Sequence, residues 1–534
     1  MADLVTDVVI VGFGAAGACA AIEAADAGAD VLVVDRFQGG GASAVSGGVI
    51  YAGGGTAQQR DAGVEDSVTA MYDYLRLETE DVVSDKTLRR FCAGSAEMIT
   101  WLESNGVPFE GSLCPYKTSY PNDDFYLYYS GSESAGRFRD AAKPAPRGHR
   151  VKGPGTSGKL LAARLMTAVR RRGVRVLPQT NARSLVTGES GAVVGLRVST
   201  LRDAPGWVRT AHRLLGRYSA KPGIYIPSLR KALHRRAVAL ESKYARELEI
   251  TARRGVVLSA GGFIANRELV REHAPAYRGG LALGTSADDG SGIRLGVEAG
   301  GMTAEMDRIT AWRFITPPSA FLGGLLVDAG GRRVIDESRY GAAIGEALIT
   351  RHEGKGWLLV DDTIIREARR NARSQAQWFQ WLQTVYLIRR GRMVADSIAE
   401  LARRAGIDAD GLAATFAAYH GDGPDAAGKP PEFVRALDTP PYSLMDVSIK
   451  PSLGFPCPML TLGGLVVDEE TGRVRGENGE PITGLYAAGR TAVGICSRSY
   501  VSGLSLADCV FSGRRAGLNS ALAQGLLDKN ENVF

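Results

Sequence analysis

A glycine motif near the N-terminus has the spacing of a turn that binds nucleotides. An apolar run, residues 8–11, leads into Gly12, Gly14 and Gly17, and an alanine-rich stretch follows. In such a motif the first glycine makes the sharp turn after a strand, the second lets the backbone approach a pyrophosphate, and the third lets the helix pack on the strand. A second apolar run ends about twenty residues later at Asp35, where a carboxylate would meet a ribose hydroxyl. The motif predicts a cofactor that contains ADP and leaves NAD and FAD open.

Further glycine-rich segments favour FAD. Residues 39–48 and 53–55 offer small side chains and backbone amides that suit a pyrophosphate and the edge of a flavin ring. Residues 254–263 and 483–490 each have the pattern of a strand that ends in small residues. One large cofactor that crosses several strand ends at the carboxyl edge of a parallel sheet explains this distribution.

The composition sets the protein class. The chain has 534 residues, 45% of them hydrophobic, which predicts a folded protein of more than one domain. Its six cysteines are scattered without a Cys-x-x-Cys pair, so neither a disulfide framework nor a metal site is predicted. No signal peptide and no long uncharged apolar run is visible in the sequence. We therefore expect a cytoplasmic protein.

The positive charge of the chain is concentrated in one segment. Residues 201–246 contain eleven Lys or Arg and two acidic residues, against a net charge of +6 for the whole chain. Apolar residues at helical spacing on both sides of residues 221–223 predict two amphipathic helices. Two interpretations are equally favoured: contact with an anionic membrane surface, such as the inner face of the cell membrane, or a solvated hairpin packed on the protein. No motif for nucleic-acid recognition accompanies the charge, so we expect no nucleic-acid partner.

Together these motifs resemble the flavoprotein family of fumarate reductases, succinate dehydrogenases and 3-ketosteroid dehydrogenases. The resemblance covers residues 7–516 and is most specific in the block 484–517. It implies an α/β fold, in which a Rossmann-like FAD-binding domain carries an inserted α+β catalytic cap domain. It also implies noncovalent FAD, because residues 38–46 contain no histidine for a covalent flavin linkage.

The same resemblance implies that the FAD-binding domain is split. Residues 1–288 would form its first part, including the basic helical insert 201–246, and residues 449–534 its second part. The catalytic cap domain is expected at residues 289–448.

One position separates the branches of this family. Fumarate-reducing members carry a catalytic arginine before the last helix, and alignment on Gly489 and Asp508 places Tyr500 there. A dicarboxylate would thus lose its cationic anchor, whereas ketosteroid dehydrogenases have a tyrosine at this position. The sequence Tyr-Val-Ser-Gly at 500–503 is similar to the Tyr-x-Ser-Gly of the Δ4-(5α) branch and differs from the Tyr-Pro-Gly-Pro-Gly of the Δ1 branch. The segments 47–56, 144–149, 340–345 and 461–464 are similar to the same branch.

The resemblance implies oxidation of saturated 3-ketosteroids at C4–C5. A proton would leave C4, which the C3 carbonyl acidifies, and a hydride would leave C5 for flavin N5. The catalytic hydroxyls that it implies belong to Tyr340, Tyr500 and Ser502. A neutral tyrosine, with a pKa of about 10, is a weak base alone. We therefore expect Ser502 to pass the proton through Tyr500 and Tyr340, aided by the N-terminal end of the following helix, with the order of Ser502 and Tyr500 left open. The backbone amide of Gly503 would hold the enolate oxygen.

Further site residues come from the motifs and the resemblance. The predicted substrate contacts besides Gly503 are Tyr126, Tyr128 and Tyr129, for which core packing is the alternative. The predicted cofactor contacts are Gly12, Gly14, Ala15, Ala16, Gly17, Asp35, Arg36, Ala42, Ser43, Ser46, Gly47, Gly48, Ala182, Ala260, Gly261, Gly262, Asp289, Gly489, Arg490, Ser505 and Leu506.

The residues leave three other functions open. Two are enzymes of the same family, a 3-ketosteroid Δ1-dehydrogenase and a flavin-dependent enone reductase. The third is a non-catalytic carrier of flavin or steroid that uses the basic insert as an interaction module. The expected partners of the enzyme are a 3-ketosteroid and an electron acceptor that the sequence does not identify.

Overall fold

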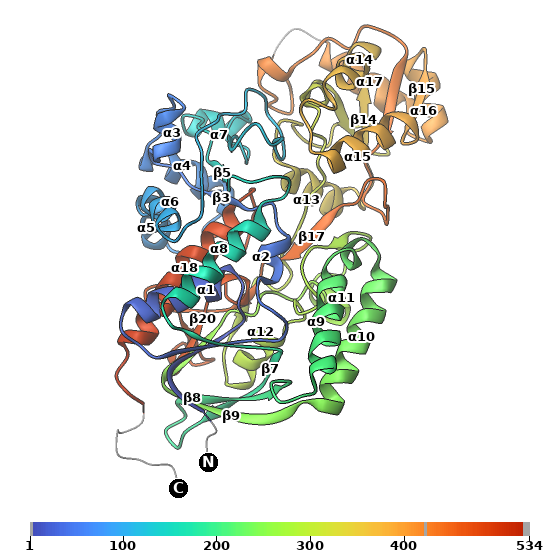
Figure 1. The fold of residues 1–534 in the computed structure, drawn as a ribbon. Coiled ribbons are helices and arrows are strands. Elements are labelled where there is room, and N and C mark those ends of the chain that lie inside the picture. The colour runs from blue at the N-terminus through green and yellow to red at the C-terminus, as the bar shows by residue number, and fades with distance from the viewer. Residues whose placement is uncertain (1–3, 421–423, 527–534) are drawn as a thin grey trace.

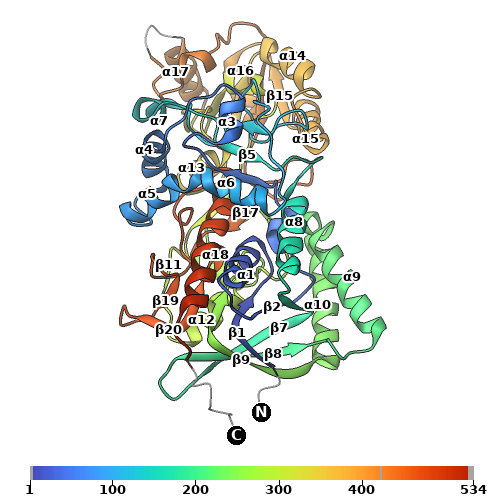
Figure 2. The same cartoon turned by 60° about the vertical axis from the view of Figure 1, so that its left-hand side comes forward.

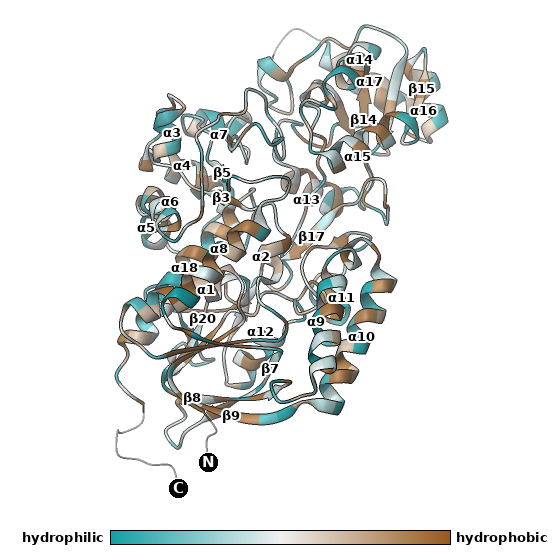
Figure 3. Ribbon diagram, viewed as in Figure 1, coloured by the Kyte–Doolittle hydropathy of each residue, from teal (hydrophilic) through white to brown (hydrophobic). Residues whose placement is uncertain are grey.

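The computed structural model describes residues 4–420 and 424–526, and a large sheet forms the base of the molecule (Figure 1). Its spatial order is β19 (Arg473–Arg475), β20 (Pro481–Ala487), β9 (Arg246–Leu258), β1 (Leu4–Val11), β2 (Val31–Asp35) and β6 (Arg175–Pro178), with β7 (Thr180–Thr187) and β8 (Val193–Thr200) joined through β9. The strands from β20 to β6 are parallel. The Val, Ile and Leu residues in the carboxyl-terminal halves of β1, β2 and β9 are buried, as strands covered on both faces require, and Figure 3 shows much of this sheet in brown.

Two helices from opposite ends of the sequence pack on one face of this sheet. α1 (Ala15–Asp26) and α18 (Leu504–Leu522) lie side by side in Figure 2. Glycine at position 513 permits their close approach, because a Cβ atom there would lie only 2.5 Å from the carbonyl oxygen of Ala16. The other elements of this part are α2 (Gly41–Val45), α8 (Gly158–Arg171), α11 (Arg267–His273), α12 (Ser291–Glu298), η4 (Gly489–Thr491), β10 (Leu281–Ala282), β11 (Thr303–Ala304), β12 (Ile309–Ala311), β17 (Pro458–Thr461) and β18 (Gly464–Leu465). The predicted Rossmann-like domain, assembled from both ends of the chain, is confirmed.

The upper right part of Figure 1 has its own sheet and its own core. Its strand order is β13 (Leu325–Val327), β14 (Trp357–Val360), β16 (Tyr442–Asp446) and β15 (Arg392–Ala395), all antiparallel. Its helices are η2 (Ser319–Gly323), α13 (Gly341–Arg351), α14 (Asp362–Asn371), α15 (Trp378–Arg389), α16 (Ile398–Ala405), α17 (Ala409–Tyr419) and η3 (Pro431–Phe433). This α+β unit matches the expected inserted cap. The packing does not change at residue 289, because Ile293 and Leu295 of α12 belong to the core of the large sheet, whereas the cap core begins at Ile315.

A third group of elements lies beside the cap, above α1 and α18 (Figures 1 and 2). It contains α3 (Ala57–Asp61), α4 (Val68–Thr79), α5 (Asp85–Ala93), α6 (Ser95–Ser104) and α7 (Gly136–Ala141), and a small sheet of β3 (Val49–Tyr51), β5 (Gly148–Arg150) and β4 (Leu127–Tyr128). Arg147 and Asp66, both fully buried, form an ion pair in this region.

The two helices predicted in the basic insert are confirmed. α9 (Gly206–Ala220), η1 (Gly223–Tyr225) and α10 (Pro227–Tyr244) form a hairpin along one side of the large sheet (Figure 1). One face of the hairpin is buried through Val208, His212 and Glu241. The other face exposes basic residues together with Trp207 and Tyr218, so it is both positively charged and apolar. No helix in the described part of the chain is long and apolar enough to span a bilayer.

Candidate active site

The glycine motif builds a cradle at the carboxyl end of β1. Gly12 has φ +97°, and a Cβ atom there would lie 2.6 Å from the Ser259 carbonyl oxygen. A Cβ atom on Gly17 would lie 2.0 Å from the Gly12 carbonyl oxygen, so α1 is pressed against the turn. Gly14, in contrast, faces open space at the N-terminus of α1, where a Cβ atom would have only Ser43 Oγ within 4 Å, at 3.6 Å. Open space beside a helix N-terminus suits the pyrophosphate of a dinucleotide.

Distant segments complete this cradle. Gly261, which follows β9, donates its amide hydrogen to Thr491 Oγ1 over 3.0 Å. Arg490 donates one guanidinium hydrogen to Asp288 Oδ1 over 2.5 Å. Its Nη1 is buried and has no partner among the described residues, while a Cβ on Gly262 would lie 3.1 Å from it. A buried cationic donor that still needs an acceptor, in a wall of small residues, fits an anionic dinucleotide.

The other predicted cofactor residues lie around the same edge of the sheet. Ser43 Oγ accepts the Ala15 amide hydrogen over 3.0 Å, which fixes the loop of α2 against α1. Asp35 ends β2 as predicted, but its carboxylate accepts backbone amides of Phe13, Phe37 and Gly39. The remaining predicted residues lie on these elements: Ala16 on α1, Ala42 in α2, Ser46, Gly47 and Gly48 after it, Ala182 on β7, Ala260 after β9, Asp289 before α12, Gly489 in η4, and Ser505 and Leu506 in the first turn of α18. Arg36 forms ion pairs with Glu241 and Asp289.

The predicted catalytic residues converge from two parts of the chain. Tyr340 precedes the first turn of α13, and Tyr500, Ser502 and Gly503 lead into α18. The rings of Tyr340 and Tyr500 lie with centroids 6.4 Å apart. Burial raises the pKa of both hydroxyls, and a hydrogen bond with Ser502 acts on the Tyr340 hydroxyl. The three hydroxyl groups therefore share one buried site.

Tyr128 is the hydroxyl partner that the sequence did not assign to this cluster. Its Oη lies 3.0 Å from Ser502 Oγ, and burial raises its pKa. It was expected only to line the pocket. The Tyr126 ring lies against the Arg150 guanidinium, whose carbon is 4.9 Å from the ring centroid. Tyr129 lines a cavity of about 20 Å³ next to Tyr340, which is room for one water molecule.

A serine-rich loop holds the two catalytic segments together. Ser130 Oγ donates to the Ser502 carbonyl over 3.1 Å, and the Ser502 amide donates to the Ser130 carbonyl over 3.2 Å. Ser132 Oγ accepts the Tyr340 amide hydrogen over 3.1 Å. The loop joins Tyr340 of the cap to Ser502, which lies just before the last helix.

Aromatic residues from the segment that follows β12 complete the wall. The Trp312 ring lies 5.1 Å from that of Tyr500, and the Phe314 ring lies 5.6 Å from that of Tyr340. The Trp312 indole nitrogen is buried and has no partner among the described residues. Neither residue was predicted, because an isolated Trp-Arg-Phe sequence carries no signal of a site. The result is an apolar wall beside neutral hydroxyls.

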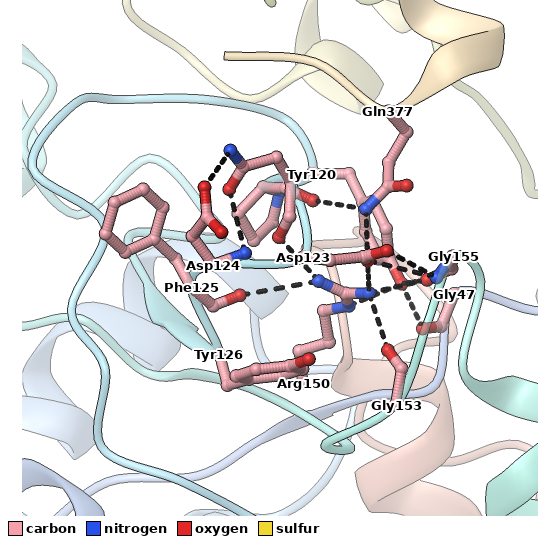
Figure 4. Close-up of polar contacts among 12 residues, drawn as sticks. Gly47, Tyr120, Asp123, Asp124, Phe125, Tyr126, Arg150, Gly153, Gly155 and Gln377 are labelled. Atoms are coloured by element: carbon pink, nitrogen blue, oxygen red, sulfur yellow. Dashed lines mark hydrogen bonds and ion pairs between the residues drawn. The ribbon is translucent and has the colours of Figure 1, made fainter. Parts of the chain in front are cut away.

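A buried arginine joins the cofactor loop to the cap (Figure 4). The Arg150 guanidinium, fully buried, donates to the carbonyls of Gly153 and Gly155 and to the hydroxyl of Tyr120. It also pairs with Asp123, which accepts a hydrogen bond from the cap residue Gln377 over 2.7 Å. Tyr120 in turn donates to the Gly47 carbonyl over 2.7 Å. One side chain thus fixes the loop around Gly47 and the first residue before α15.

We expect Arg150→Met to lower the free energy of unfolding by about 3 kcal/mol, because it leaves buried carbonyl groups without donors. The measurement is the midpoint of thermal unfolding of the holoprotein. The matched control is Arg170→Met at an exposed position of α8, which should leave the midpoint unchanged. Equal midpoints for both variants would contradict the structural role of Arg150.

Comparisons with known proteins agree with this geometry. The family described as FAD binding domain matches residues 7–503. The chain belongs to this flavoprotein family. Among its relatives is a 3-oxo-5-alpha-steroid 4-dehydrogenase of Comamonas testosteroni, 38% identical over 91% of this chain and 92% of the relative. A 3-oxosteroid 1-dehydrogenase of Mycobacterium tuberculosis is 26% identical, with 92% and 94% covered.

A solved structure supports the same assignment. The 3-ketosteroid-Δ4-(5α)-dehydrogenase of Rhodococcus jostii RHA1, in complex with 4-androstene-3,17-dione, superposes with a TM-score of 0.81. It is 30% identical in sequence, and the match covers 98% of each chain. The predicted family, fold class and cofactor of this flavoprotein are therefore confirmed, and FAD is its cofactor.

Proposed function

We propose that this flavoprotein oxidises saturated 5α-3-ketosteroids to 4-ene-3-ketosteroids. The observation that carries the proposal is the buried cluster of neutral hydroxyls, Tyr128, Tyr340, Tyr500 and Ser502, beside an aromatic wall. The similarity to two 4-dehydrogenases supports it. A dicarboxylate substrate would instead need a cation where Tyr500 stands.

Different groups in this site act on the hydride and on the proton that leave the steroid. FAD, when bound, supplies the acceptor for the hydride that leaves C5. Ser502 Oγ takes the proton from C4 and passes it toward Tyr128, whose hydroxyl lies 3.0 Å away, or toward Tyr340, whose pKa Ser502 lowers against the larger effect of burial. Because burial raises the pKa of both tyrosines, they stay protonated near neutral pH and relay the proton as a neutral chain.

Tyr500 polarises the ketone. Burial raises the pKa of the Tyr500 hydroxyl, and the backbone of Gly503 acts in the opposite direction. The hydroxyl hydrogen of Tyr500 would bind the C3 carbonyl of the steroid. That bond strengthens as negative charge develops on the carbonyl oxygen and so accelerates the loss of the C4 proton. Gly503 thus acts through Tyr500 in this arrangement.

The proposal is tested by mixing the holoenzyme anaerobically with a panel of saturated 5α-3-ketosteroids. We expect the flavin absorbance to bleach and a 4-ene product to appear. An unchanged spectrum with every steroid would favour a carrier and overturn the proposal. A 1-ene product, or bleaching only by a reductant followed by recovery with an enone, would identify the Δ1-dehydrogenase or the reductase. Sustained turnover requires an electron-accepting dye.

The exposed side chains of the α9–α10 hairpin favour a second role. We propose that the hairpin docks on anionic membranes. Its outer face exposes Trp207 (60%), Tyr218 (48%) and Ile226 (43%) among basic residues. Aromatic side chains in a basic surface suit the interface of an anionic bilayer, from which a lipophilic steroid would be taken. Figure 3 shows hydrophilic and hydrophobic residues interleaved on α9 and α10.

We expect the holoprotein to sediment with phosphatidylglycerol vesicles at low salt and to be released at high salt, because salt screens the charge attraction. Trp207→Ser combined with Tyr218→Ser should weaken vesicle binding about tenfold without changing FAD content. Phosphatidylcholine vesicles serve as the control. Failure of the unmodified protein to sediment with the anionic vesicles would exclude this role.

A further inference from the structure

The inner face of the α9–α10 hairpin has a different character from its outer face. We propose that this face is a clamp that holds the adenosine half of FAD. Glu241 and His234 of α10 form the clamp together with Arg36 and Asp289. The insert then contributes to cofactor binding, independently of which steroid the enzyme oxidises.

The position of the hairpin supports this assignment. In a parallel sheet with this glycine motif, the ribose of the cofactor lies at the carboxyl end of the second strand. That strand is β2, which ends at Asp35, and the next residue is Arg36. Asp35 itself accepts three backbone amides, so part of its hydrogen-bonding capacity is already used. The next polar side chain at this strand end is that of Arg36, which contacts the hairpin.

Helix α9 is packed directly on this strand end. The Phe37 and His212 rings stack with centroids 5.3 Å apart and an interplanar angle of 18°. A Cβ atom on Gly216 would lie 2.5 Å from the Phe37 ring, so the helix backbone is pressed against it. Ser219 Oγ lies 3.0 Å from Ser286 Oγ, which joins the far end of α9 to the loop that leads to Asp289.

Helix α10 holds the opposite side of the same site. Arg230 donates to the carbonyls of Ala282 and Gly284, over 2.9 and 3.2 Å. The hairpin therefore bridges the end of β2 and the loop 282–289, which are the two segments that would flank the ribose. The side chains of His212, Ser219 and Arg230, which make these contacts from the hairpin, are buried.

An ion network runs from the hairpin to the predicted cofactor residues. Arg36 binds both carboxylate oxygens of Glu241, over 3.0 and 3.1 Å, and donates to Asp289 Oδ2 over 3.0 Å. His212 Nδ1 accepts from Gln179, so its Nε2 carries the hydrogen that is donated to Glu241 over 2.9 Å. Burial would raise the pKa of Glu241, but the hydrogen bonds from His212 and Arg36 outweigh it and lower the pKa to about 2.

This network orients the groups that remain available to a ligand. Asp289 keeps 28% of its side chain exposed, so its carboxylate can accept a ribose hydroxyl while Arg36 holds it in place. His234 has a buried Nδ1 without a partner among the described residues. Burial and the charge of Arg36 lower the pKa of His234, so the imidazole is neutral and suits an uncharged base such as adenine.

The test compares two flavins on reconstituted apoprotein. FAD carries the adenosine half and FMN lacks it, so a clamp for adenosine changes only the affinity for FAD. We expect Glu241→Gln and His234→Ala each to raise the dissociation constant for FAD about tenfold and to leave that for FMN within twofold. Arg235→Gln, an exposed position of α10, is the matched control and should change neither constant.

The outcomes separate the clamp from a purely structural hairpin. Equal weakening of FAD and FMN would mean that the variants disturb the fold, and it would overturn the proposal. Unchanged FAD affinity in both variants would overturn it as well. If Glu241→Gln fails to fold, His234→Ala decides, because His234 lies outside the Arg36–Glu241 ion pair. Failure of steroid oxidation would not affect this result, since no substrate is used.

Discussion

Replacing Tyr500 by phenylalanine is expected to lower the turnover of 5α-3-ketosteroids by a factor of about 10² to 10⁴ while FAD stays bound. The phenyl ring keeps its packing on Trp312 and Tyr340, whose ring centroids lie 5.1 and 6.4 Å away. Only the hydroxyl that would polarise the ketone is removed. The measurements are the rate of anaerobic flavin bleaching and the ratio of flavin to protein.

Tyr72→Phe is the matched control for this variant. Tyr72 is also a buried tyrosine, but its hydroxyl binds Asp85 on α5, outside the hydroxyl cluster. We expect the control to bleach at the rate of the unmodified enzyme. If Tyr500→Phe kept a rate within threefold of the control, Tyr500 would not polarise the ketone and the proposed mechanism would fail.

Gly17→Val is expected to abolish FAD binding. A Cβ atom at this position would lie 2.0 Å from the Gly12 carbonyl oxygen and 2.7 Å from Ser259 Oγ. Neither the turn nor α1 can move without opening the cradle, and the turn depends on the φ of Gly12, +97°, which residues other than glycine rarely adopt. Overpacking of this kind costs about 3 kcal/mol or more. Flavin absorbance of the purified protein and its thermal midpoint provide the measurement.

Gly206→Ala controls for the loss of a glycine itself. Gly206 begins α9, and nothing lies within 4 Å of the position that a Cβ would take. Because alanine favours a helix over glycine by about 1 kcal/mol, the control should retain FAD and be as stable as the unmodified protein or slightly more. Normal flavin content in Gly17→Val would refute the close packing of α1 on the glycine turn.

Local sequence patterns predicted most of the FAD-binding part. The apolar runs of β1 and β2, the glycines between them and the alanine-rich helix α1 are adjacent in the chain, so their spacing reports their geometry. The helical spacing of residues 201–246 likewise predicted α9 and α10. The cap was predicted only from resemblance, and α12, which follows residue 289, packs on the large sheet.

The candidate site was predicted in part. Tyr340, Tyr500 and Ser502 followed from a resemblance in short motifs, and the structure brings them together. Tyr128 was expected only as a pocket wall, because its bond to Ser502 joins residues that are 374 positions apart. No periodicity within a strand or helix reports a contact of that kind.

The amino-acid sequence by itself determined the cofactor class, the strands and turns that hold it, and the residue types offered for chemistry. These features depend on interactions between neighbours along the chain, where spacing and side-chain size fix the backbone. Only the tertiary structure decided which hydroxyl binds Ser502, and that the hairpin presents Glu241 to Arg36, 205 positions away. Such contacts arise when separate elements pack together, and the buried charges and hydroxyls must then find partners wherever the fold supplies them.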